Sequence, residues 1–128
     1  MEKGKILVMD DEELVRNVVA RMLEFLGYRV VVAKDGDEAV DLYRSHQDSG
    51  AGFDAAILDL SVPGGKGGKE TMVKLLDLDP AAKGIVSSGY SDSHGVGDYA
   101  RFGFTAAIGK PYELKTLEDT LRQVLGGP

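Results

Sequence analysis

The chain contains no cysteine and no long apolar run. Without cysteine, neither disulfide bonds nor a cysteine-ligated metal or cluster can hold the fold together. No run approaches the roughly 18 apolar residues that a membrane-spanning helix needs, and no signal-peptide core opens the chain. These absences predict a cytoplasmic protein with no membrane contact of its own.

Basic residues are also few, because 15 Lys and Arg stand against 21 Asp and Glu, which gives a formal net charge of −6. Nucleic-acid binding depends on neutralising phosphates, so this balance disfavours direct contact with nucleic acid. The 128 residues are 43% hydrophobic and 28% charged, which is typical of one globular domain. We therefore expect residues 1–128 to be a single domain, with its core between about residues 5 and 125.

Short apolar runs alternate with longer segments of helical period, a pattern typical of a parallel α/β sheet. The predicted strands are residues 5–9, 29–33, 53–58, 83–88 and 104–109. The predicted helices cover residues 12–26, 68–78 and 92–102, a segment after the turn at Asp35-Gly36 that carries Ala39, Val40, Leu42 and Tyr43, and a final segment after Pro111. The expected fold is a flavodoxin-like, doubly wound sheet in the order 2-1-3-4-5 with five helices.

Apolar stripes predict which helix faces are buried. In the first helix, the predicted stripe is Leu14, Val15, Val18, Val19, Met22, Leu23 and Leu26, and in the last helix it is Leu114, Leu117, Leu121, Val124 and Leu125. The fourth helix has a weak signal because Gly95 and Gly97 each cost about 1 kcal/mol relative to alanine in a helix interior. His46 and His94 are interpreted as solvated surface residues, not as metal ligands.

Polar side chains follow the predicted strands at one edge of the sheet. Asp10 and Asp11 come after the first strand, Asp59 after the third, Ser88 ends the fourth, and Lys110 follows the fifth. In a doubly wound sheet these positions meet at the functional crevice. Two like charges about 4 Å apart repel by roughly 4 kcal/mol at an effective dielectric near 20, so converging carboxylates need a cation. An all-oxygen donor set suits Mg²⁺.

One carboxylate of this set can act as a nucleophile, since aspartate forms an acyl phosphate by in-line attack on a phosphoryl donor. Asp59 is the best candidate because it ends an apolar strand, whereas Asp10 and Asp11 adjoin further acidic residues that are typical of a cation site. Lys110 can offer a cation to one phosphoryl oxygen, and the Ser88 hydroxyl can donate a hydrogen bond to another.

With these motifs the sequence resembles a response-regulator receiver domain of two-component systems, from about Lys5 to Leu125. The segments that carry the resemblance are VMDDE at 8–12, ILDLSVP at 57–63, VSSGY at 86–90 and GKP at 109–111. Two of the loops, at 63–68 and 87–91, resemble receivers attached to hybrid sensor histidine kinases. We expect a phosphorelay protein that works as a signalling switch and not as an enzyme, because it turns over no external product.

The resemblance implies a role for each site residue. Asp59 accepts a phosphoryl group from the phosphohistidine of a sensor histidine kinase or phosphotransfer protein. Mg²⁺ is held by Asp11, Asp59 and the backbone carbonyl of Ser61, assisted by Asp10. Ser88 is the hydroxyl switch residue. Lys110 contacts the phosphate, and the peptide bond that follows it is often cis in this family.

The sequence departs from the family pattern at Ala107, where many receivers carry a Tyr or Phe that reports phosphorylation. We hypothesise that ordering of residues 92–102 is the response instead, at the surface formed by the predicted fourth helix, fifth strand and fifth helix. The expected partners are the phosphodonor, an unidentified output protein and, as a weak contact, a second copy of the chain.

Other functions remain open at this point. A haloacid-dehalogenase-like phosphohydrolase needs a second aspartate two residues after its nucleophile, where this chain has Ser61. A flavodoxin-like electron carrier would bring its cofactor phosphate to the acidic run at 10–13, which would repel it. A degenerate receiver that serves only as a protein-binding module is the third alternative.

Overall fold

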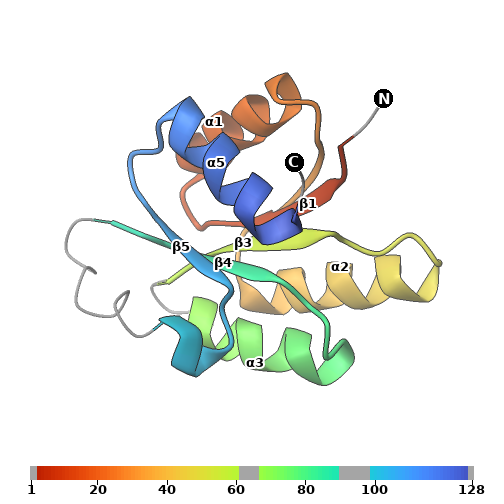
Figure 1. The fold of residues 1–128 in the computed structure, drawn as a ribbon. Coiled ribbons are helices and arrows are strands. Elements are labelled where there is room, and N and C mark those ends of the chain that lie inside the picture. Colours follow the sequence, from red (N-terminus) through yellow and green to blue (C-terminus); the bar gives the residue numbers. More distant parts are fainter. Residues whose placement is uncertain (1–2, 61–66, 90–98, 127–128) are drawn as a thin grey trace.

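The computed structural model describes residues 3–60, 67–89 and 99–126, in which five parallel strands form one sheet (Figure 1). The strands are β1 (Lys5–Met9), β2 (Arg29–Ala33), β3 (Ala55–Asp59), β4 (Gly84–Ser88) and β5 (Ala106–Gly109). Their order is β2-β1-β3-β4-β5, and each neighbouring pair is parallel. The predicted fold class and strand order are therefore confirmed.

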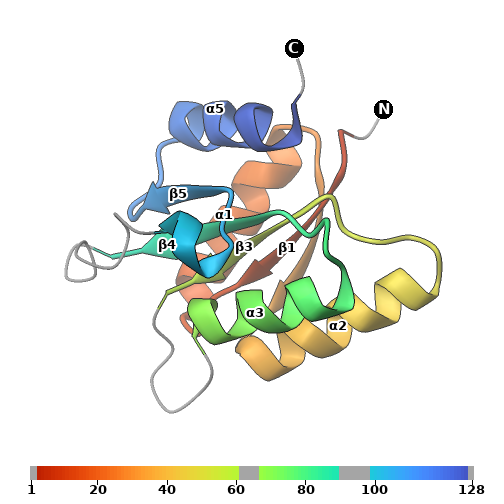
Figure 2. The ribbon, with the colours of Figure 1, turned by 60° about the horizontal axis from the view of Figure 1, so that its bottom comes forward.

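Helices cover both faces of the sheet, as the two ribbon views show (Figures 1 and 2). They are α1 (Glu13–Phe25), α2 (Gly36–Asp48), α3 (Gly68–Leu78) and α5 (Leu114–Leu125), with a 3-10 helix, η2, at Tyr99–Phe102. One apolar core lies between the sheet and α1 and α5, and a second between the sheet and α2 and α3. In the part of the chain that the structure describes, no helix is long and apolar enough to cross a membrane.

Five helices were expected, and the described residues contain four α-helices; the difference lies at the fourth predicted helix. Its described part is the short η2, while residues 92–98 lie outside the described residues. The strands β3, β4 and β5 begin one or two residues later than predicted. Segment 104–105, for example, approaches the sheet before the ladder of β5 begins, and its Thr105 N–H donates to the Gly84 carbonyl.

Local sequence signals explain the start of α2 and the end of α1. Asp35 caps α2, since its Oδ1 accepts a hydrogen bond from the Glu38 N–H, and the Glu38 carboxylate accepts one from the Lys34 N–H in return. Gly27 ends α1 with a φ of 103°, a left-handed conformation that glycine adopts without steric cost. The predicted role of Gly27 as the residue that ends the first helix is confirmed.

The predicted apolar stripes include residues that the sheet does not bury. In α1, Val19 and Leu23 are buried as expected, but Leu14 is 77% exposed and Val18 49% exposed. Leu114, at the first turn of α5, is 38% exposed. The prediction that these three residues are buried is wrong. Leu14 and Val18 lie on the side of α1 that lines an open groove, and Leu114 is the first residue of α5.

The interpretation of His46 as a solvated surface residue holds only in part, because His46 is half-buried, and His94 lies outside the described residues. The His46 ring packs against Phe53 at 4.7 Å between centroids, and its Nδ1 lies 2.6 Å from the Lys5 Nζ. The Lys5 ammonium also donates to the Ala51 carbonyl and lies over the Phe53 ring. Burial, then the Lys5 charge and then that of Arg29, lower the pKa of His46. This cluster joins β1 to the end of α2.

We expect His46 to titrate below the ordinary imidazole pKa of about 6.5 and to destabilise the fold when it is protonated. Because its pKa is lowered in the folded state, its contribution to stability is complete above about pH 6.5 and is lost as the pH falls through the lowered value. NMR titration of the ring protons measures this pKa, and His46→Gln assigns the signal. Lys5→Met should raise the pKa; an unchanged value would show that the Lys5 charge has no influence.

Candidate functional site

The candidate site lies where β1, β3, β4 and β5 end. Asp10 directly follows β1, and Asp59 is the last residue of β3; their exposed fractions are only 2% and 3%. Ser88 is the buried last residue of β4, and Lys110 follows β5. The Lys110 N–H donates to the Ser88 carbonyl at 2.8 Å. The parallel sheet thus brings together residues that are up to 100 positions apart.

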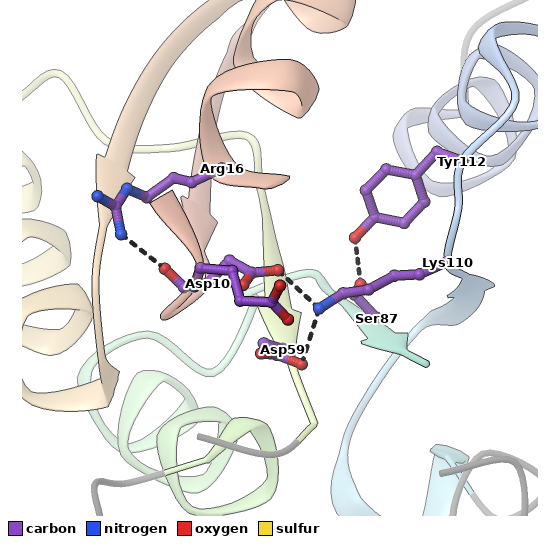
Figure 3. A network of polar contacts seen from close by, with 7 residues as sticks. Asp10, Arg16, Asp59, Ser87, Lys110 and Tyr112 are labelled. Atoms are coloured by element: carbon purple, nitrogen blue, oxygen red, sulfur yellow. Dashed lines mark hydrogen bonds and ion pairs between the residues drawn. The ribbon is translucent and has the colours of Figure 1, made fainter. Parts of the chain in front are cut away.

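The Lys110 ammonium lies between two carboxylates (Figure 3). Its Nζ is 2.8 Å from Asp10 Oδ2 and 3.3 Å from Asp59 Oδ1. Lys110 reaches this position with its side chain 16% exposed, so that the contacts lie mostly out of water. Three of the predicted site residues therefore form one cluster.

Burial and charge act in opposite directions on Asp59. Burial raises the pKa of the Asp59 carboxyl to about 7, the Lys110 charge opposes this rise, and the Asp10 charge and the Asp11 carboxyl add to it. For Lys110, burial lowers the pKa, but the hydrogen bond to Asp10 and the charges of both carboxylates outweigh burial and raise it to about 12. Lys110 therefore stays protonated at neutral pH, whereas burial disfavours the charged form of the Asp59 carboxyl.

A group of acidic side chains beside this cluster could hold a metal ion. One ligand atom each of Asp10, Asp11 and Glu12 lie within 4.8 Å of one another, and Asp11 and Glu12 are exposed. Asp10 Oδ1 also accepts the Glu12 N–H at 2.9 Å, which fixes its carboxylate. These donors are all oxygens and fit a hard divalent cation such as Mg²⁺. Ser61, the predicted carbonyl ligand, lies outside the described residues.

Four residues of the site were absent from the predicted set. Glu12 joins the acidic group, and Arg16 donates to the Asp10 backbone carbonyl at 2.8 Å. Ser87 and Tyr112 form a hydrogen bond between their hydroxyl groups (Figure 3). Burial raises the pKa of Tyr112 to about 12, although the Ser87 bond and the Lys110 charge act to lower it. The alternation of side chains in β4 could have shown that Ser87 faces away from Ser88.

An apolar groove of about 410 Å³ opens beside the cluster. One wall is the side of α1 with the exposed Leu14 and Val18, and the other is formed by Lys110, Pro111 and Tyr112. The Lys110–Pro111 peptide bond is cis, in agreement with the family resemblance. Lys110 thus belongs both to the carboxylate cluster and to the wall of the groove.

Comparison with known protein families shows which family this chain belongs to. Residues 6–122 match the family model of the response regulator receiver domain. The chain belongs to this family. Receiver domains are signalling modules, and response regulators interact with histidine kinases or phosphotransfer proteins.

Individual similar proteins agree with this assignment. A probable transcriptional regulator, ycf27, from Porphyridium aerugineum is 33% identical over 132 residues, which cover 98% of this chain and 49% of the relative. This chain therefore spans about half the length of that relative. A CheY-like receiver domain protein from Methanospirillum hungatei has a TM-score of 0.82 at 26% identity, with 95% of this chain and 93% of that chain covered. CheY4 of Vibrio cholerae has a TM-score of 0.81 at 27% identity, over 95% and 98%.

Proposed function

We propose that this receiver domain, with its core at residues 5–125, is a Mg²⁺-dependent phosphoacceptor switch and that Asp59 accepts the phosphoryl group. The donor is the phosphohistidine of a sensor histidine kinase or phosphotransfer protein. The observation that carries the proposal is the Lys110 ammonium held between two buried carboxylates, Asp10 and Asp59, at the strand ends. A carboxylate such as Asp59 can attack phosphorus, and a cation beside it can stabilise the negative charge of the phosphoryl group that it accepts.

The proposed reaction is an in-line displacement. An Asp59 carboxylate oxygen forms a bond to phosphorus while the phosphorus–nitrogen bond to the donor imidazole breaks, and the nitrogen keeps that electron pair. Hydrolysis later returns inorganic phosphate and the free carboxylate. Asp10, Asp11 and Asp59, with the Ser61 carbonyl, would hold Mg²⁺, which supplies positive charge for the phosphoryl oxygens when it is bound.

Lys110 and Ser88 serve the phosphorylated state in this proposal. After transfer, Asp59 no longer carries a free carboxylate, so the Lys110 ammonium can pair with a phosphoryl oxygen while it keeps its 2.8 Å contact with Asp10. The Ser88 hydroxyl, at the buried end of β4, can donate to a second oxygen. We infer that the response reaches the surface of β5 and α5 with residues 92–102, and that an output protein binds there.

Intact-mass measurement tests the function directly. With Mg²⁺ and acetyl phosphate as a small phosphodonor, the protein should gain the mass of one phosphoryl group, and the gain should disappear with excess chelator. Without the cation, three carboxylates and the incoming phosphoryl group repel one another, which removes most of the rate. A protein that takes no label with Mg²⁺ would contradict the proposal and favour the alternative of a degenerate, protein-binding receiver.

The apolar groove is where we expect the protein donor to bind. A donor histidine must come within bonding distance of Asp59, and Lys110, which contacts Asp59, also forms part of the groove wall. Leu14 and Val18 are the large apolar side chains exposed on the other wall. A helix of the donor with an apolar face fits this surface, because covering Leu14 and Val18 removes apolar area from water.

Leu14→Asp should therefore reduce transfer from a phosphorylated histidine protein by at least about tenfold. Its labelling by acetyl phosphate should remain at the wild-type rate, because Leu14 is not in the carboxylate cluster. Phe25→Asp is the matched control, since Phe25 is 78% exposed and lies at the other end of α1. Equal losses in both variants would contradict binding at the groove. The measurement is the rate of label transfer from the donor on a gel.

A further inference from the structure

The hydroxyl pair of Ser87 and Tyr112 has no part in the proposed reaction, yet both residues adjoin residues that do. Ser87 directly precedes Ser88, and Tyr112 comes two positions after Lys110. Ser87 is 1% exposed, and the Tyr112 hydroxyl lies in hydrogen-bond contact with it (Figure 3). A hydrogen bond with a partner this deeply buried fixes the two segments relative to each other more firmly than one in water.

Backbone contacts place Ser87 between the two sides of the site. It pairs with Asp59 in the register of β3 and β4, and its carbonyl accepts the Leu60 N–H at 2.8 Å. The next carbonyl, that of Ser88, accepts the Lys110 N–H at 2.8 Å. The turn that carries Lys110 is therefore attached to β4 on one side by a backbone bond and on the other by the Tyr112 hydroxyl.

We propose that Tyr112 is a positioning residue for phosphoryl transfer, which acts by binding Ser87 and so holding the Lys110 turn against β4. Lysine has a flexible four-carbon stem, and its ammonium must lie close to both Asp10 and Asp59. Fixing the backbone on both sides of Lys110 limits the positions that the ammonium can reach, and catalysis is sensitive to errors of about 1 Å. This inference rests on the proposed function and adds a residue to it.

The competing explanation is that Tyr112 only fills space. Its ring packs against the core beneath α1 and α5 and lines the apolar groove. A phenylalanine would keep that packing and lose only the hydroxyl. Tyr112→Phe therefore separates the two explanations, and Ser87→Ala removes the same bond from the other side.

The test is the rate of labelling by acetyl phosphate at saturating Mg²⁺, followed by intact mass. Tyr112→Phe and Ser87→Ala should each slow labelling by about three- to tenfold, and the double variant should be no slower than the slower single variant. Ser87→Thr, which keeps a hydroxyl, should restore most of the rate. Tyr43→Phe is the matched control, because the Tyr43 hydroxyl donates to Asp79 Oδ2 at 2.8 Å in the core on the other face of the sheet.

The outcomes distinguish a failure of the positioning role of Tyr112 from a failure of the proposed phosphoacceptor function. Wild-type protein that takes no label overturns both. Wild-type labelling together with a wild-type rate for Tyr112→Phe overturns the positioning role alone, as does a double variant whose loss equals the product of the single losses. An equal slowing in Tyr43→Phe would also overturn it, because the loss would then follow from weakened packing in general.

Discussion

Asparagine in place of Asp59 should abolish labelling by acetyl phosphate and at the same time make the metal-free protein more stable. The loss of labelling follows because an amide oxygen has no carboxylate charge with which to attack phosphorus. The gain in stability follows because burial raises the pKa of Asp59, so the folded protein pays to ionise this group at neutral pH. Lys110 would still have Asp10 as a partner, whose Oδ2 lies 2.8 Å from the Lys110 Nζ in the wild-type protein.

The pH dependence gives this prediction a second measurement. The pKa of Asp59 is raised to about 7 in the folded protein, from an ordinary value of 3.8. A raised pKa means that ionisation destabilises the fold increasingly between these two values. In chelator, the stability advantage of Asp59→Asn should thus be small at about pH 4 and should grow by roughly 1.4 kcal/mol per pH unit up to about pH 7. Urea denaturation at several pH values measures it.

Asp54→Asn is the control for both effects. Asp54 lies just before the other end of β3, where its carboxylate accepts the Lys5 N–H at 2.8 Å, and asparagine keeps an acceptor there. This variant should be labelled like wild type. Labelling of Asp59→Asn at the wild-type rate would show that another residue accepts the phosphoryl group. A stability that falls at pH 7 would show that the Lys110 contact outweighs burial at Asp59.

The site could be predicted because it depends on strand ends. In a parallel sheet, the ends of apolar runs identify the residues that meet at one edge, and Asp10, Asp59 and Lys110 follow from that rule alone. The register of the strands brings the backbone at Asp59 and the strand ends just before Asp10 and Lys110 to the same edge of the sheet.

Other features depend on tertiary contacts that no periodicity contains. The helical period of α1 predicts that both Leu14 and Val19 are buried, although only Val19 is buried against the sheet. The contact of His46 with Lys5 depends on how the end of α2 folds back to β1. The bond between Ser87 and Tyr112 depends on the path of the chain after Pro111, which the sequence indicates only as the end of a strand.

Lys110→Met should have the second large effect, a loss of at least about a hundredfold in the labelling rate, because it removes a charge aimed at the developing phosphoryl anion. It should also cost about 3 kcal/mol of unfolding free energy in chelator at pH 7, since Asp10 and Asp59 would remain buried without the ammonium between them. Labelling is followed by intact mass, and stability by urea denaturation.

Adding Mg²⁺ tests whether the stabilising effect of Lys110 comes from its charge. If Lys110 stabilises the fold by neutralising carboxylates, Mg²⁺ at the same carboxylates should restore more stability to Lys110→Met than it adds to wild type. Lys115→Met is the control, because Lys115 is 82% exposed and pairs only with Asp119 at 3.4 Å among the contacts described for it. It should change stability by less than about 0.5 kcal/mol. A Lys110→Met protein that Mg²⁺ does not rescue would mean that the lysine stem, and not its charge, supports this edge of the sheet.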